Sequence, residues 1–171
     1  MYPDIVLLKH KLFDPYQVTF GGYIQEPESS AYSACRFSLG HQLVVFRSAK
    51  LTPKKAGLFV TLWKRDMAGI TIPFDENDAA DLVMIFAKGI NQMGAFIFPK
   101  AVLIEKKIFS TQTVEGKRGF RVYPPWDSTT SKQAKQTQEW QGNYFMEFNS
   151  GYPVDQRLLV NLGFGRSLFP I

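Results

Sequence analysis

The chain has 171 residues and a formal net charge of +5, and 45% of its residues are hydrophobic, so it can form one domain with a substantial core. Its 15% aromatic content argues against a disordered protein, and no apolar run approaches the roughly 18–20 residues that a membrane helix needs. Because Asp4, Lys9 and Lys11 interrupt any secretion signal and one cysteine excludes an internal disulfide, we expect a cytoplasmic protein that does not bind membranes.

The first half of the chain predicts a short helix followed by strands. Residues 5–13 can form a helix that ends before Asp14-Pro15, because the residue before a proline avoids the helical conformation. Residues 35–39 and 42–48 predict a hairpin with a short turn between them. Residues 58–65 predict a single strand, since they are rich in β-branched and aromatic side chains.

The middle of the chain predicts the centre of a sheet. Residues 72–80 form a polar, acidic loop, and residues 81–88 then run apolar almost continuously, which is typical of a strand covered on both faces. Residues 95–98 predict its partner strand. Residues 100–109 follow Pro99, which suits the first turn of a helix, and predict a helix.

The last part of the chain predicts one more strand and one more helix. Residues 119–123 indicate a short strand, and residues 131–148 place apolar side chains at helical spacing. Residues 151–171 are expected to form an irregular C-terminal extension. The order of elements predicts a single α/β domain over residues 1–171, with helices flanking one mixed sheet.

Cations gather in one window of the sequence. No acidic residue lies between Glu28 and Asp66, and this window holds seven cations: Arg36, Arg47, Lys50, Lys54, Lys55, Lys64 and Arg65. Segregated positive charge is what a polyanion-binding surface requires, although a solvated basic face is the alternative.

A second basic segment, GKRGFRVYPPWD (residues 116–127), interleaves cations with aromatic residues. In an extended strand, Lys117, Gly119, Arg121 and Tyr123 share one face and Arg118 lies on the other. Arginine forks suit phosphate oxygens, and aromatic rings stack on bases. The alternative places the aromatic rings in the core and the arginines in surface ion pairs.

These segments predict a nucleic-acid interface, with DNA expected ahead of RNA. Several predicted strands end in cations, so basic side chains can reach neighbouring places at the sheet edge. The predicted contacts are Arg47, Lys50, Lys54, Lys64, Arg65, Lys117, Arg118, Arg121, Tyr123 and Trp126.

A metal-dependent nuclease is the second hypothesis. Asp81 opens a buried strand and Lys100 follows the partner strand, which is the layout of the PD-(D/E)xK nucleases. The second acid of that pattern is replaced by Phe98. Glu26 and Glu105 are the other candidate carboxylates, and Asp81 is the candidate ligand for Mg²⁺, which would activate water.

The chain resembles the MepB-like family of bacterial proteins over about residues 20–148. The resemblance rests on SSAYSACRF (29–37), FRSAKLTPKKAG (46–57), FVTLWKR (59–65), GAFIFPKAVLIEK (94–106) and GKRGFRVYPPWD (116–127), and on the helix with Lys132, Gln133 and Trp140. It implies a restriction-endonuclease-like fold, a mixed sheet flanked by helices. It supplies no catalytic set to carry over.

The family takes its name from genes beside a multidrug efflux pump, which raises a third hypothesis. The chain would then be an accessory factor that binds a protein or small molecule in drug efflux or stress. The leading hypothesis remains a nucleic-acid-binding protein on a nuclease-like scaffold.

Overall fold

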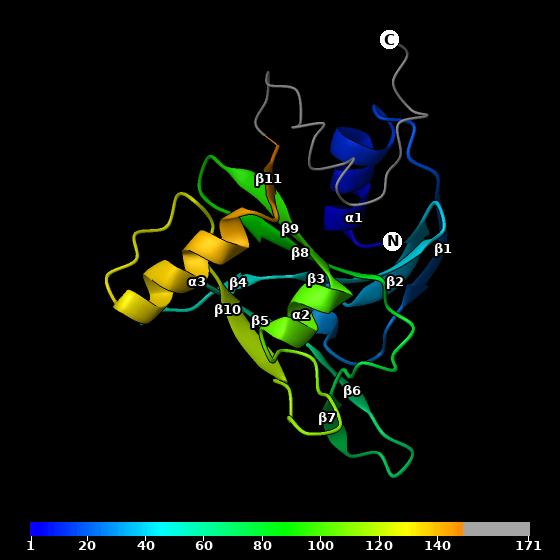
Figure 1. Cartoon of the computed structure of the whole chain (residues 1–171). Coiled ribbons are helices and arrows are strands. Elements are labelled where there is room, and N and C mark those ends of the chain that lie inside the picture. Colours follow the sequence, from blue (N-terminus) through cyan, green and yellow to red (C-terminus); the bar gives the residue numbers. More distant parts are fainter. Residues whose placement is uncertain (149–171) are drawn as a thin grey trace.

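The computed structural model describes residues 1–148, and the predicted extension at 151–171 lies outside them. Within this part of the chain the main feature is a six-stranded sheet (Figure 1). Its strand order is β1 (Phe20–Gln25), β2 (Cys35–Leu39), β3 (Gln42–Ser48), β8 (Leu82–Lys88), β9 (Met93–Pro99) and β11 (Phe145–Glu147). Strands β3 and β8 are parallel and every other neighbouring pair is antiparallel, so the sheet is mixed, as predicted.

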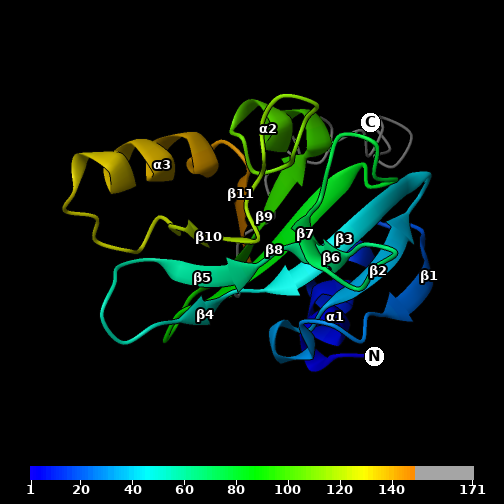
Figure 2. The same cartoon turned by 90° about the horizontal axis from the view of Figure 1, so that it is seen from below.

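Both faces of the sheet are covered, which explains the unbroken apolar run of β8. One face packs against α1 (Pro3–Leu8) and the π-helical turn η1 (Lys9–Phe13). The other face packs against α2 (Lys100–Glu105) and a smaller sheet. In Figure 2, α1 and α2 lie on opposite sides of the main sheet.

The smaller sheet has the order β10 (Gly119–Val122), β5 (Leu58–Thr61) and β4 (Lys50–Leu51). Inward-facing positions such as Val60 and Val122 are buried against the main sheet. Because side chains alternate along a strand, Phe59 and Arg121 face outward. This outer face is where the basic segments meet.

The prediction of one strand over 58–65 was wrong. The strand breaks at Leu62, whose N–H donates to the Arg118 carbonyl at 2.9 Å. Beyond this point, β6 (Trp63–Arg65) pairs with β7 (Thr71–Pro73) in a separate hairpin, so the predicted 72–80 loop begins in a strand.

The helix predicted over 131–148 is also shorter than its pattern suggested. Ser131 accepts the Ala134 N–H at 3.1 Å and caps α3 (Lys132–Gly142). Residues 145–147 instead pair with β9, because the main sheet offers an open edge there. The helix predicted over 100–109 ends at Glu105, and Lys107 follows with a left-handed φ of 57°.

None of the helices in residues 1–148 has the length and apolar character needed to cross a lipid bilayer.

Candidate nucleic-acid interface

Arg47, a predicted phosphate contact, lies inside the protein. Its side chain is 0% exposed, and its guanidinium forms an ion pair with Glu26 at 2.5 Å. Glu26 also accepts a hydrogen bond from Arg36 at 2.5 Å, so one carboxylate holds two guanidiniums. Burial lowers the pKa of Arg47 and Glu26 acts against that shift. The prediction for Arg47 is corrected, because a phosphate outside the protein cannot reach it.

Lys64 is held by two aspartates. Its amine lies 2.7 Å from Asp75 and 2.7 Å from Asp78. Partial burial disfavours the ammonium, but these contacts raise the pKa of Lys64 above its usual value. The hydrogen bond between Lys64 and Asp75 also lowers the pKa of the Asp75 carboxyl. The charge of Lys64 is therefore neutralised within the protein.

Arg65 and Arg118 also have carboxylate partners. Arg65 pairs with Glu28 at 3.2 Å and Arg118 pairs with Glu115 at 2.8 Å. In the folded protein, carboxylates from outside the acid-free window therefore lie beside cations within it. Arg47 is held in a buried ion pair and Lys64 in a half-buried one, whereas Arg65 and Arg118 form exposed surface pairs.

The candidate nuclease residues each have a separate contact. The Asp81 carboxylate accepts the Leu43 N–H at 2.8 Å, which continues the ladder between β3 and β8. The Lys100 amine donates to the Asp78 carbonyl at 2.5 Å. Glu105 is exposed and pairs with Lys106 at 2.8 Å.

The structure does not bring these carboxylates into a metal site. Glu26 is occupied by its two arginines, and within residues 1–148 no three His, Cys, Asp or Glu side chains lie close enough together to hold a metal ion. These residues therefore do not fit the predicted Mg²⁺ centre, which needs several oxygen ligands.

A row of cations and rings crosses the outer face of the smaller sheet. Strand register places Arg121 opposite Phe59, and Phe59 opposite Lys50. The Arg121 guanidinium lies 5.9 Å from the centre of the Phe59 ring. The ring of Tyr32, in the 3₁₀ turn η2 (Ser30–Tyr32), meets Phe59 edge-on at 6.4 Å, and the Lys50 amine lies 5.1 Å from Tyr32. We call these four residues the cation–aromatic row.

Arg121 also joins this row to the basic loop at 52–57. Its guanidinium donates to the Thr52 hydroxyl at 2.7 Å and to the Ala56 and Gly57 carbonyls at 3.2 Å. All three partners are neutral. Arg121, Thr52, Lys54 and Lys55 line one shallow depression, and within residues 1–148 none of these three cations has a carboxylate partner.

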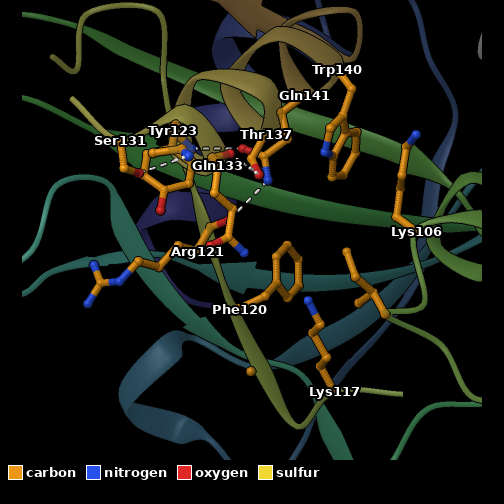
Figure 3. A pocket seen from close by; sticks show the side chains of 13 residues that line it. Lys106, Lys117, Phe120, Arg121, Tyr123, Ser131, Gln133, Thr137, Trp140 and Gln141 are labelled. Carbon is orange, nitrogen blue, oxygen red and sulfur yellow. Dashed lines mark hydrogen bonds between the residues drawn. The ribbon is translucent and has the colours of Figure 1, made fainter. Parts of the chain in front are cut away.

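A pocket of about 360 Å³ lies between α3 and β10, on the other side of Arg121 (Figure 3). Trp140 points into it from the helix and Phe120 from the strand. Lys106 and Lys117 lie at one end, and Gln133 and Thr137 line the helical wall. We call this cavity the α3–β10 pocket.

Two predicted stacking residues have packing contacts. Trp126 meets Phe145 edge-on with ring centres 5.4 Å apart, which matches the core-packing alternative. Tyr123 lies against Gly57, where a Cβ would come within 2.6 Å of its ring, and it also lines the α3–β10 pocket. Gly119 is required for close approach within the sheet, since a Cβ there would lie 2.7 Å from the Phe59 ring.

Sequence reasoning missed four residues of this surface: Tyr32, Phe59, Lys106 and Trp140. Alternation in the LFVT strand could have placed Phe59 outward. Trp140 was assigned to the apolar stripe of α3, and it does contact the core ring of Phe98 at 5.5 Å. Only the pairing of strands shows that Lys50, Phe59 and Arg121 are neighbours.

Comparisons with known proteins agree with the sequence resemblance. A protein-family model described as MepB-like matches residues 26–147. A solved structure titled "Crystal Structure of MepB" has 36% sequence identity, a TM-score of 0.76, and a match covering 88% of this chain and 99% of that chain. No curated protein matches this chain. The mixed α+β architecture is shared, whereas the restriction-endonuclease-like fold stays a prediction.

Proposed function

The chain belongs to the MepB-like family, and from the contacts of its own residues we propose that it binds nucleic acid through the outer face of its smaller sheet. The observation that carries this proposal is a group of cations on this side of the molecule, none of which has a carboxylate partner within residues 1–148. These cations are Lys50, Lys54, Lys55, Lys117 and Arg121. Phosphate neutralisation by such groups drives binding, because it releases condensed counterions.

The arrangement of Arg121 supports a phosphate contact. Its donors already hold the 52–57 loop in place, which positions Lys54 and Lys55 beside it. A loop fixed in advance loses less conformational freedom on binding. DNA is expected ahead of RNA, and a cytoplasmic location belongs to the same proposal.

Charge removal at the 52–57 loop tests the proposal. We expect Lys54→Gln combined with Lys55→Gln to weaken binding of labelled DNA and RNA about tenfold at low salt, since two phosphate contacts are lost. Fluorescence anisotropy with single-stranded and duplex forms of each measures this.

The matched control is Lys9→Gln combined with Lys11→Gln. These lysines lie in η1, which covers the opposite face of the main sheet, so affinity should stay unchanged. Absence of binding by the unaltered protein at low salt, or equal losses in both double variants, would refute the proposal.

A further inference from the structure

The α3–β10 pocket has the size and lining of a site for one nucleotide. Its volume of about 360 Å³ lies in the range of small-molecule sites. The half-buried indole of Trp140 provides an aromatic face, and the buried ring of Phe120 lines the pocket from β10. Gln133 and Thr137 supply polar groups that can hydrogen-bond the edge of a base.

Cations lie where the phosphates of such a nucleotide would be. The Lys106 amine lies 5.5 Å from the centre of the Trp140 ring, and Lys117 extends into the space beside Phe120 (Figure 3). Lys106 is tied to the protein by an ion pair with the exposed Glu105. A weak surface pair of this kind lets the amine turn from the indole to a phosphate.

Arg121 lines both the α3–β10 pocket and the basic depression, and its guanidinium belongs to the cation–aromatic row. Along the row, Phe59 and Tyr32 present rings between Lys50 and Arg121. Rings can stack on bases only where the base faces are free. In a duplex those faces are covered by neighbouring base pairs, whereas single strands expose them.

We infer that the strand bound by this protein is single-stranded, and that the α3–β10 pocket receives one of its unpaired bases. The inference rests on the proposed function and adds the form of nucleic acid to it. Phosphates contact the lysines and Arg121, and bases stack on Trp140 and Phe59.

Three labelled probes of about 12 nucleotides separate stacking from charge, a length within the range that one single-strand-binding domain covers. They are an oligothymidylate, a DNA duplex, and a fully abasic strand that keeps the phosphates. We expect the oligothymidylate to bind on the order of tenfold more tightly than either other probe at low salt. Equal binding of the duplex or of the abasic strand overturns the inference but leaves the proposed function standing. No binding of any probe overturns both.

A blocked pocket gives the second test. Thr137→Phe places a ring in the pocket, and Gln136→Phe adds the same ring to the exposed side of α3 as the matched control. We expect the first variant to bind the oligothymidylate about tenfold less tightly, with abasic-strand binding unchanged. Circular dichroism confirms folding of both variants. Equal affinity of the two folded variants for the oligothymidylate overturns the inference.

A third variant pair removes the stacking surface itself. Trp140→Leu should lose about as much affinity as the blocked pocket, and Trp140→Phe should keep most of it, since a phenyl ring still stacks. Because Trp140 contacts Phe98, the leucine variant is compared only where its thermal unfolding is two-state. A folded leucine variant with unchanged affinity contradicts base stacking on Trp140.

Discussion

Glu26 bridges two arginines from different strands, Arg36 in β2 and Arg47 in β3. Its two carboxylate oxygens hold Arg36 and the fully buried Arg47. Taking an arginine out of water is costly unless a partner and hydrogen bonds compensate. The Arg47 guanidinium also donates to the Phe46 carbonyl at 2.8 Å. Glu26 is therefore a structural residue in this arrangement.

Without the negative charge of Glu26, Arg36 and Arg47 would face each other with no carboxylate between them, and Arg47 is buried away from water. We expect Glu26→Gln to lower the free energy of unfolding by about 3–5 kcal/mol, as when one partner of a buried pair is lost. Urea unfolding followed by circular dichroism measures this. The control Glu105→Gln breaks an exposed pair and should cost at most about 1 kcal/mol. Similar losses in both variants would argue against the structural role of Glu26.

Cys35 is a small buried residue of the core beneath α1. Its side chain is 0% exposed, and burial raises its pKa to about 12. The thiol therefore stays protonated at neutral pH, which is the unreactive form.

At the scale of elements, Lys64 ties the β6–β7 hairpin to the segment that leads into β8. Its partners Asp75 and Asp78 both lie in that segment. The carboxyl pKa of Asp75 is lowered, chiefly by the hydrogen bond from Lys64. The folded state therefore binds this proton less tightly than the unfolded chain does, and the contact contributes stability above the unfolded pKa.

This linkage predicts an acid-dependent loss of stability. The contribution of Asp75 is present above about pH 4 and is lost as the pH falls through the lower folded pKa. We expect Asp75→Asn to reduce the free energy of unfolding at neutral pH and to flatten its fall between about pH 4 and 2. Urea titrations across that range measure both effects. Glu139→Gln, on the exposed side of α3, serves as the control. If the free energy of unfolding of the Asp75 variant fell as steeply below pH 4 as that of the unaltered protein, the prediction would be contradicted.

At the scale of the whole molecule, the pairing of charges decides which of the predicted cations are free of carboxylate partners. The sequence predicted eight cationic contacts, and four of them have carboxylate partners in the structure: Arg47, Lys64, Arg65 and Arg118. Lys55 joins the four that remain: Lys50, Lys54, Lys117 and Arg121. The proposed interface therefore holds five cations in place of the eight predicted.

Salt dependence reports the number of these contacts directly. For a single strand the slope of log K against log salt is about −0.7 per phosphate neutralised. The five cations of the outer face and Lys106 of the α3–β10 pocket make six contacts, which predict a slope of about −4.2. Eight contacts would give about −5.6 by the same relation. Anisotropy titrations with the oligothymidylate at several salt concentrations measure the slope. A value near the steeper limit would mean that the paired cations also release their carboxylates on binding.

The hairpin at 35–48 and the buried strand at 81–88 were predictable, because period-two alternation and unbroken apolar runs are local properties of the chain. The end of α3 was not. Phe145 and Phe148 fit a helical stripe in the sequence, but residues 145–147 pair with β9 in the structure. A local pattern cannot show that a distant strand has an open edge.

The sequence by itself was enough to identify the mixed α+β class and the family resemblance. It also showed the basic and aromatic composition of the segments that form the surface. Tertiary structure alone decided which cations are neutralised. Arg47 and Lys64 lie in an acid-free window of the sequence, yet the fold brings Glu26 and Asp75 to them from outside it. Ion pairs form over a few ångströms in space, and that distance is set by strand register and packing instead of position along the chain.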